Sequence, residues 1–269
     1  MKRISVLCLV CLVATVASAE DEVHPFISSK FSLQAGAFFP SKNFDIRVDG
    51  TLTGENEQID FDESLGLGGS DNIFALEFKW RFGEKWSTRL QYFGSDQEGK
   101  AVLEDDIQWG DETILAGSSV TAGTSFDLTR VFVGRSFESS EKVDFGAGFG
   151  VHFLEIGAFI KEDLITTFGE KSSVSVSGPL PNIGAWYYYS PSPKWFVGGR
   201  IDWLQVSVGK YDGGITNFAV GVNYQMFQNI GIGVKYQLFR LGVDVDDDTW
   251  HGRAVLNYDG AIVYLSANW

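Results

Sequence analysis

The chain has 269 residues, of which 44% are hydrophobic and 21% charged, and its formal net charge at pH 7 is −14. This acidity argues against nucleic acid as a partner, because phosphates would repel the chain. After residue 19 no run of about eighteen residues is apolar, which excludes a helical membrane protein. The 31 Gly, 22 Phe, 9 Tyr and 8 Trp residues instead favour strands and turns.

The first residues predict a signal peptide. Lys2 and Arg3 form a positively charged start, residues 4–16 are apolar, and residues 17–19 give an A-x-A cleavage site. A transmembrane anchor is the alternative, but the apolar run is short and ends at small residues rather than at a charged stop. Both cysteines lie inside this segment, so the mature protein is expected to contain none. Its stability must then come from hydrogen bonds and packing rather than from disulfides.

The rest of the chain contains segments in which apolar residues alternate with small or polar ones. This period of two is typical of strands with different environments on their two faces. The signal is clearest in the pair formed by residues 73–82 and 86–92. Ten segments follow the pattern, and they are residues 31–39, 73–82, 86–92, 124–137, 143–153, 182–189, 195–203, 217–226, 230–238 and 260–269.

Two regions are ambiguous. Within the acidic stretch 41–71, residues 44–48 and 59–61 are candidates for a small hairpin, but residues 44–49 are also a candidate for a further spanning strand. In residues 124–137, Arg130 and Arg135 fall on opposite sides of a strand, so the pattern does not decide which face points inward. The strand count depends on the first of these regions.

If residues 41–71 form one loop, the count is ten strands, with eight and twelve as alternatives. Four short turns then alternate with five longer acidic connections, some of which, such as residues 101–108, are candidates to extend the sheet. This alternation predicts a closed antiparallel up-and-down β-barrel with periplasmic turns at one end and extracellular loops at the other. An aromatic girdle is expected near the short turns, formed by Trp80, Phe82, Trp86, Tyr187, Tyr189, Trp195, Tyr224 and Trp269.

The last ten residues read as one membrane-crossing strand with an aromatic carboxy-terminus. One face is purely apolar and consists of Ala261, Val263, Leu265, Ala267 and Trp269. A strand of this length suits a tilted crossing of the bilayer. In these residues the chain resembles bacterial outer-membrane β-barrels, the class of small barrels of the OmpA and OmpX type, whose terminal strand typically ends in Phe or Trp.

The resemblance implies a domain organisation and a set of partners. It implies a cleaved signal peptide at residues 1–19, a periplasmic lead-in at 20–29, an outer-membrane barrel at 30–269 and location in the bacterial outer membrane. It also implies contact with outer-membrane lipid and lipopolysaccharide, recognition of the terminal strand by the barrel-assembly machinery, and a monomer without a cofactor.

The predicted inward faces carry charges of both signs, and these should pair because an unpaired ion inside a narrow barrel is costly to desolvate. The set comprises Glu77, Lys79, Arg81, Arg89, Asp144, His152, Arg200, Asp202, Lys235 and Tyr264. A row of inward glycines between residues 144 and 152 leaves room for large side chains from opposite walls, or lets the sheet bend. If the charge pairs bridge the lumen, the barrel is plugged; if they line opposite walls, they could select small solutes. A barrel of this size favours the plugged form.

The histidines are the first candidates for a catalytic residue. Known outer-membrane phospholipases and lipid A deacylases resemble one another in a His-x-Ser pair, but Leu154 stands where His152 would need its serine. His152 is also expected to face the lumen rather than lipid. At the outer rim, His251 lies close in sequence to three aspartates and is the group most similar to the omptin protease site. The paired acids and the His-Asp couple of the omptins have no aligned match in this sequence. No catalytic residue is therefore assigned.

The acidic run near the carboxy-terminus has the spacing D-x-D-x-D, with Asp244, Asp246 and Asp248 as weak candidates for metal ligands. It lacks the glycine and the bidentate glutamate of an EF-hand, so that loop type is rejected. A solvated acidic loop tip is the simpler interpretation, and no metal is assigned. The sequence thus favours a non-enzymatic outer-membrane barrel with a plugged lumen that acts in envelope integrity or surface interaction through its loops; a small solute channel is the alternative, and a hydrolase comes third.

Overall fold

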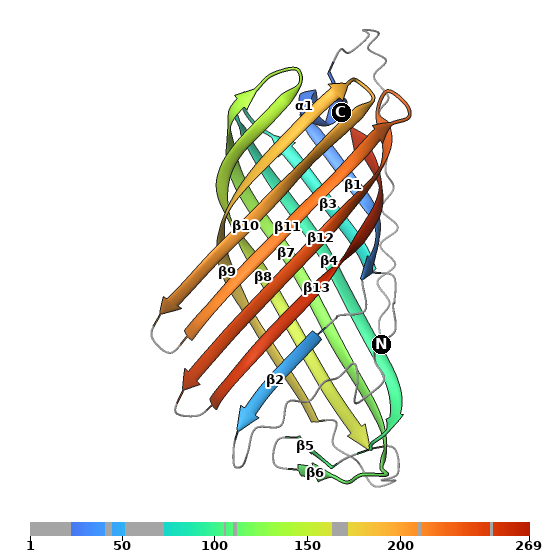
Figure 1. Cartoon of the computed structure of the whole chain (residues 1–269), viewed down its shortest axis with the longest axis vertical. Coiled ribbons are helices and arrows are strands. Elements are labelled where there is room, and N and C mark those ends of the chain that lie inside the picture. Colours follow the sequence, from blue (N-terminus) through green and yellow to red (C-terminus); the bar gives the residue numbers. More distant parts are fainter. Residues whose placement is uncertain are drawn as a thin grey trace.

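A computed structural model of the chain describes residues 23–40, 45–51, 73–104, 106–109, 112–162, 172–208, 211–247 and 250–269. The predicted signal peptide lies outside these residues and remains a prediction. Nearly all of the described chain is strand, apart from one short helix (Figure 1). The elements are α1 (Pro25–Ser28), β1 (Phe31–Pro40), β2 (Asp45–Thr51), β3 (Ile73–Arg81), β4 (Trp86–Val102), β5 (Ile107–Trp109), β6 (Glu112–Ile114), β7 (Ser119–Ser139), β8 (Val143–Glu162), β9 (Ser172–Ser192), β10 (Trp195–Val208), β11 (Tyr211–Gln225), β12 (Ile230–Asp247) and β13 (Trp250–Asn268).

Ten of the strands form one closed antiparallel barrel. Their order is β1-β3-β4-β7-β8-β9-β10-β11-β12-β13, and β13 pairs again with β1. At the seam, the Phe31 amide donates to the Trp269 carbonyl at 2.8 Å and the Trp269 amide donates to the Phe31 carbonyl at 2.9 Å. The predicted ten-stranded up-and-down barrel is confirmed, and the alternatives of eight and twelve strands are wrong.

The ambiguous segment after β1 is not an additional spanning strand. Pro40 of β1 pairs with Gly260, and Asp45 of β2 pairs with Asn257 a little farther along the same edge of β13. β2 therefore prolongs the first strand, so the count stays even. The alternative hairpin with residues 59–61 involves residues outside the described part of the chain.

The two ends of the barrel differ in the way predicted, but the strands are longer than the alternation suggested. The short turns lie at the same end as α1 and the carboxy-terminus (Figure 1). At the other end β7 and β9 each have 21 residues and β13 has 19, whereas a strand needs only about 9–11 residues to cross a bilayer. Much of what was predicted as outer loops, including most of residues 204–216 and 239–259, is therefore sheet. The alternation fades there because water replaces lipid outside, so the outward face no longer has to be apolar.

One place in the extended wall departs from the closed ladder. Pairing between β9 and β10 continues only as far as Ile183 and Trp203 within the described residues, although β9 runs on to Ser172 beside β8. Pro179 and Pro181 lie in β9 just past this point. Proline has no amide hydrogen to donate, so this edge of β9 cannot continue a regular ladder.

The outer surface of the turn-proximal half is apolar and exposed. Among its large side chains, Trp195 is 47%, Val234 46% and Leu265 57% exposed. The predicted girdle residues near the turns include Trp195 and Tyr224, whose ring centroids lie 4.8 Å apart. Such a continuous apolar belt around a closed barrel is stable only in hydrocarbon. The protein is thus an outer-membrane β-barrel, as its sequence predicted. Among the described residues no helix is long and apolar enough to cross a membrane.

Candidate functional site in the barrel lumen

The strand pleat turns alternate residues into the lumen, and all ten residues of the predicted inward set lie on lumen-facing positions. Seven of them are buried, and these are Lys79, Arg89, Asp144, His152, Arg200, Asp202 and Tyr264. The other three, Glu77, Arg81 and Lys235, have side chains that are 11%, 18% and 12% exposed. The lumen is therefore filled by polar side chains and is the site to consider for function.

Glu77 of β3 connects separate walls of the barrel. Its Oε2 lies 2.8 Å from Lys235 Nζ of β12, and its Oε1 lies 3.8 Å from Arg200 Nη1 of β10. Lys235 also donates to Gln34 Oε1 at 3.2 Å, and Arg200 donates to Gln91 Oε1 at 2.7 Å. These contacts join strands that are not neighbours in the sheet, so they cross the lumen instead of lining it.

Asp202 is the centre of a second cluster. Arg130 Nη2 lies 2.5 Å from Asp202 Oδ1, and both side chains are fully buried. Arg200 Nε lies 3.3 Å from Asp202 Oδ2, and Asn217 donates to the same oxygen at 3.4 Å. One carboxylate thus faces two guanidinium groups in a region closed to water.

Sequence reasoning left Arg130 unassigned, and the structure shows why. Arg130 is buried in the lumen, whereas Arg135, five residues farther along β7, is exposed on the outer face near the turns. The two are on opposite faces, as the spacing required. The apolar residues Val131 and Val133 on the outward face of β7 were the usable signal, since lipid tolerates valine and not arginine at mid-strand.

Asp144 of β8 forms a third cluster nearer the turns. Arg81 Nη2 lies 3.3 Å from Asp144 Oδ2, while Ser136 Oγ and Trp186 Nε1 donate to Oδ1 at 2.8 and 3.2 Å. The Trp186 ring fits beside inward glycines. A Cβ at Gly134 or Gly146 would come within 2.5 Å of that ring. The glycine row therefore makes room for a large side chain, as predicted, although the ring comes from a neighbouring strand and not from the opposite wall.

Two lumen cations do not form an ion pair with any carboxylate of the described residues. Arg89 donates to the Tyr188 hydroxyl at 2.7 Å, and its guanidinium carbon lies 4.6 Å from the centre of the Trp186 ring. Lys79 donates to the carbonyl of Phe26 and lies 4.0 Å from the centre of that ring. Aromatic faces thus replace carboxylates as their partners.

Positive charges therefore outnumber negative ones inside the described barrel. Among the residues whose side chains are described, the inward carboxylates are three, Glu77, Asp144 and Asp202, and the inward cations are six, Lys79, Arg81, Arg89, Arg130, Arg200 and Lys235. The sequence predicted charge pairing, but the pairing is incomplete, because the five cations of the predicted set already exceed its three carboxylates and Arg130, which pairs with Asp202, adds a sixth cation. The chain as a whole has a net negative charge, whereas the described side chains of the lumen have a net positive charge.

The described residues before the first strand lie in the mouth of the barrel at the end with the short turns. His24, Phe26 and Ile27 are buried, and the Phe26 ring lies 4.4 Å from that of Phe196 and 5.4 Å from that of Tyr188. His24 begins the helix, because its Nδ1 accepts from the Phe26 amide at 3.1 Å and Pro25 follows it. The sequence predicted only a lead-in here, since four helical residues give no periodic signal.

The docking of α1 is expected to weaken in acid. His24 precedes the membrane-crossing strands, and burial, followed by the charge of Lys79, lowers its pKa from 6.5 to about 4. The docked helix therefore holds a neutral histidine. The equilibrium constant for docking is unaffected above pH 6.5 and falls by up to about tenfold for each pH unit between pH 6.5 and pH 4. Hydrogen exchange of the Ile27 amide, which donates to the His24 carbonyl, should quicken by up to about 15-fold from pH 6.5 to pH 5 after correction for the intrinsic rate.

The matched control for this prediction is His24→Gln, which cannot gain a proton in that range. Its exchange rate should show no such acid-dependent increase. Equal acid dependence in both proteins would contradict the assignment to His24.

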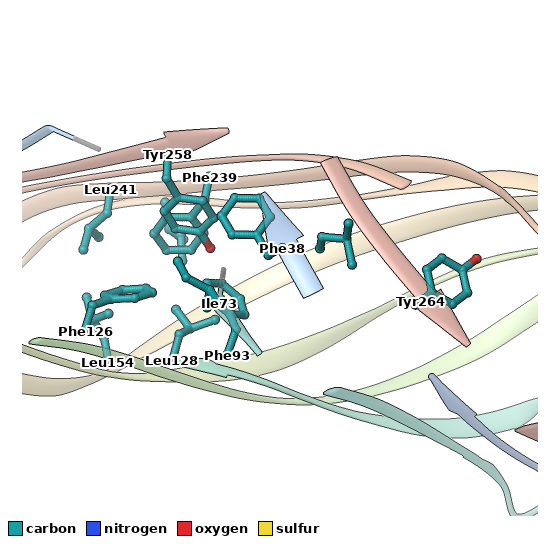
Figure 2. Packing of buried hydrophobic residues seen from close by; sticks show 12 residues of the cluster. Phe38, Ile73, Phe93, Phe126, Leu128, Leu154, Phe239, Leu241, Tyr258 and Tyr264 are labelled. Carbon is teal, nitrogen blue, oxygen red and sulfur yellow. The ribbon is translucent and has the colours of Figure 1, made fainter. Parts of the chain in front are cut away.

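A layer of apolar side chains fills the lumen on the outer side of the charged clusters. Figure 2 shows Phe38, Phe93, Phe126, Phe239 and Tyr258 converging from different strands. The rings of Phe239 and Tyr258 are stacked, with centroids 4.8 Å apart and an interplanar angle of 9°. Sequence reasoning missed this layer because it considered the inward faces only for their charges.

The remaining candidates for chemistry do not assemble a site among the described residues. His152 is fully buried; its Nε2 lies 3.5 Å from Asn217 Nδ2, and the residue two positions on, Leu154, is buried as well. Asp244 and Asp246 lie within β12 and not in a loop, with Asp246 opposite His251 of β13, while Asp248 is outside the described residues. Within the described part of the chain no group of three or more His, Cys, Asp or Glu is arranged to hold a metal ion.

One small cavity lies in the described part of the lumen. A cavity of about 40 Å³ lies between α1 and the charged clusters, next to Phe26, Tyr188, Arg200, Lys235 and Tyr264. This volume accommodates a few water molecules or one small ion, but no organic solute.

Comparisons with known proteins find similar solved structures but no related sequence. No family model matches the sequence, and no curated protein matches it. The outer membrane protease OmpT from Escherichia coli is similar in structure, with a TM-score of 0.47 and 10% identity over 90% of this chain and 94% of that one. The Pseudomonas putida toluene transporter TodX has a TM-score of 0.32 and 10% identity over 91% of each chain. Ail, the attachment invasion locus protein of Yersinia pestis, has a TM-score of 0.31 and 13% identity over 87% of this chain and 97% of that one.

Proposed function

We propose that this protein is a non-enzymatic outer-membrane barrel with a sealed lumen, which acts in envelope integrity or surface interaction through its extracellular end. The observation that carries the proposal is that the described lumen is filled at three successive levels. α1 lies in the periplasmic mouth, charge clusters cross the middle, and an aromatic layer closes the outer side. A barrel filled in this way is a rigid support for what it presents outside.

The partners that we propose follow from the outer surface. Lipid and lipopolysaccharide would cover the apolar belt, and the barrel-assembly machinery would recognise the terminal strand, whose outward residues Val263, Leu265 and Trp269 are exposed. We propose a monomer that uses no cofactor and binds no nucleic acid.

The experiment that tests the sealed lumen is conductance in planar bilayers. The purified protein is expected to give no reproducible open level, because each ion would have to displace paired charges and packed rings. Phe26→Ala, which removes the ring at the periplasmic mouth, is the companion variant. It should also fail to conduct, since the other two levels remain.

A reproducible open level in the unmodified protein would overturn the proposal and support the second candidate, a small solute channel. The charge balance gives that candidate a distinctive property. Because six cations face three carboxylates in the described lumen, such a channel should prefer anions. Reversal potentials in a salt gradient measure this preference.

A hydrolase receives little support from the geometry. The His152 imidazole is closed off from both solvent and lipid, and Asn217, not a serine or cysteine, lies beside it. Lipid A, phospholipid and peptide should therefore remain intact when incubated with the purified protein. Cleavage that is lost in His152→Ala or His251→Ala would contradict this part of the proposal.

A further inference from the structure

We propose that the lumen binds one small monovalent anion of halide size, in the cavity between α1 and the charged clusters. The inference is independent of the proposed function, because a sealed barrel and a conducting one could both hold such an ion. It rests on the charge balance of the lumen, on the charges around the cavity and on the volume of the cavity.

The first argument is the excess of buried positive charge. Among the described side chains three carboxylates face six cations in the lumen, and buried charges that are not neutralised are costly. The cations without a carboxylate partner there, Lys79 and Arg89, contact Phe26 and Tyr188, two of the residues that line the cavity. Both cations therefore lie one residue away from the cavity wall.

The second argument is the set of charges around the cavity. Arg200 and Lys235 line it directly. Arg200 is 5% exposed, so its charge lies away from water. Glu77 also lines the cavity, but each of its oxygens already faces a cation, Oε1 toward Arg200 and Oε2 toward Lys235. Two cations and one carboxylate thus line the cavity, and the local charge balance at its wall is positive.

The third argument is size. A volume of about 40 Å³ exceeds what one water molecule requires and is too small for a sugar, a nucleotide or a phosphate ester. The rest of the lining is apolar or neutral, with Phe26, Tyr188 and Tyr264 among it. A single weakly hydrated ion such as chloride or bromide fits this combination of size and charge.

The direct test is crystallography of the full protein in bromide. We expect an anomalous difference peak in the cavity beside Arg200 and Lys235 in the unmodified protein. The absence of a peak there, or density that only water explains, would overturn the proposal. This measurement needs no variant, so a folding defect cannot confuse it.

A solution test uses thermal unfolding in detergent at constant ionic strength, with sodium chloride exchanged for sodium gluconate. The unfolding midpoint should rise saturably with chloride, by about 5–10 °C at a 100-fold excess over the dissociation constant. Ala219→Val fills the cavity from its β11 wall without changing any charge and should abolish the rise. The control Ala185→Val makes the same change on the exposed outer face and should keep the rise. An identical response in both variants, or no saturable response in the unmodified protein, would refute the site.

Discussion

Replacing Asp202 with alanine is expected to lower the free energy of unfolding of the barrel by about 3–5 kcal/mol. Asp202 is fully buried and faces Arg130 at 2.5 Å and Arg200 at 3.3 Å. Its removal leaves Arg130 without an ion-pair partner among the described residues and raises the excess of lumen cations over carboxylates from three to four. Breaking a buried ion pair from one side is costly because the remaining ion is neither hydrated nor neutralised. Urea unfolding in lipid vesicles, followed by tryptophan fluorescence, measures the loss.

Two further variants separate the charge effect from the loss of a side chain. Asp202→Asn keeps the size and some hydrogen bonds but removes the charge, so it should lie close to Asp202→Ala. Glu155→Ala removes a carboxylate that is exposed on the outer face and should change stability by less than about 0.5 kcal/mol. If Asp202→Asn proved as stable as the unmodified protein, the ion pairs would not be the source of the effect.

The second large effect is expected for Phe239→Ala, which should cost about 3–5 kcal/mol. Phe239 is fully buried in the aromatic layer and stacks on Tyr258, and its centroid lies 6.1 Å from the His152 ring. The surrounding strands are held by their hydrogen-bond ladders and cannot collapse into the space, so the variant loses ring contacts and gains a cavity. The same unfolding measurement applies.

The matched control for Phe239→Ala is Phe218→Ala on the outer face of the neighbouring strand β11. Phe218 is 39% exposed on the belt, where lipid chains are fluid and fill the vacated volume. It should therefore lose the transfer free energy of the ring without the cavity contribution, and so cost less than Phe239→Ala. Equal losses at both positions would mean that the aromatic layer is loosely packed.

The part of the fold that touches lipid could be predicted from sequence, because hydrocarbon imposes a period of two on every strand that crosses it. This period predicts the strands at residues 73–82 and 230–238, and the predicted number of ten strands in the barrel is correct. Where β9 and β13 continue into water the outward face is no longer constrained, so the sequence there looks like loop. The structural environment, more than strand propensity, produces the readable signal.

The sequence predicted which residues face the lumen better than it predicted which of them form ion pairs. The inward position of Glu77 follows from alternation along one strand, but its contact with Lys235 depends on the stagger between distant strands, which no local pattern encodes. Arg130 was missed because it shares a strand with an outward arginine. The helix in the mouth was missed because Phe26 finds its partners, Tyr188 and Phe196, more than a hundred residues away.

The length of the strands has a consequence for how the protein meets its surroundings. β7, β8 and β9 each have 20 or 21 residues, roughly ten more than a bilayer crossing uses, and each extended residue adds about 3.3 Å along a tilted strand. This part of the wall therefore extends on the order of 25 Å beyond the hydrocarbon as hydrogen-bonded sheet, whereas β3 has only 9 residues. A molecule that binds the face of β7, β8 and β9 in this extension would meet a backbone already fixed by hydrogen bonds, so its binding would not have to pay the entropy of ordering that segment.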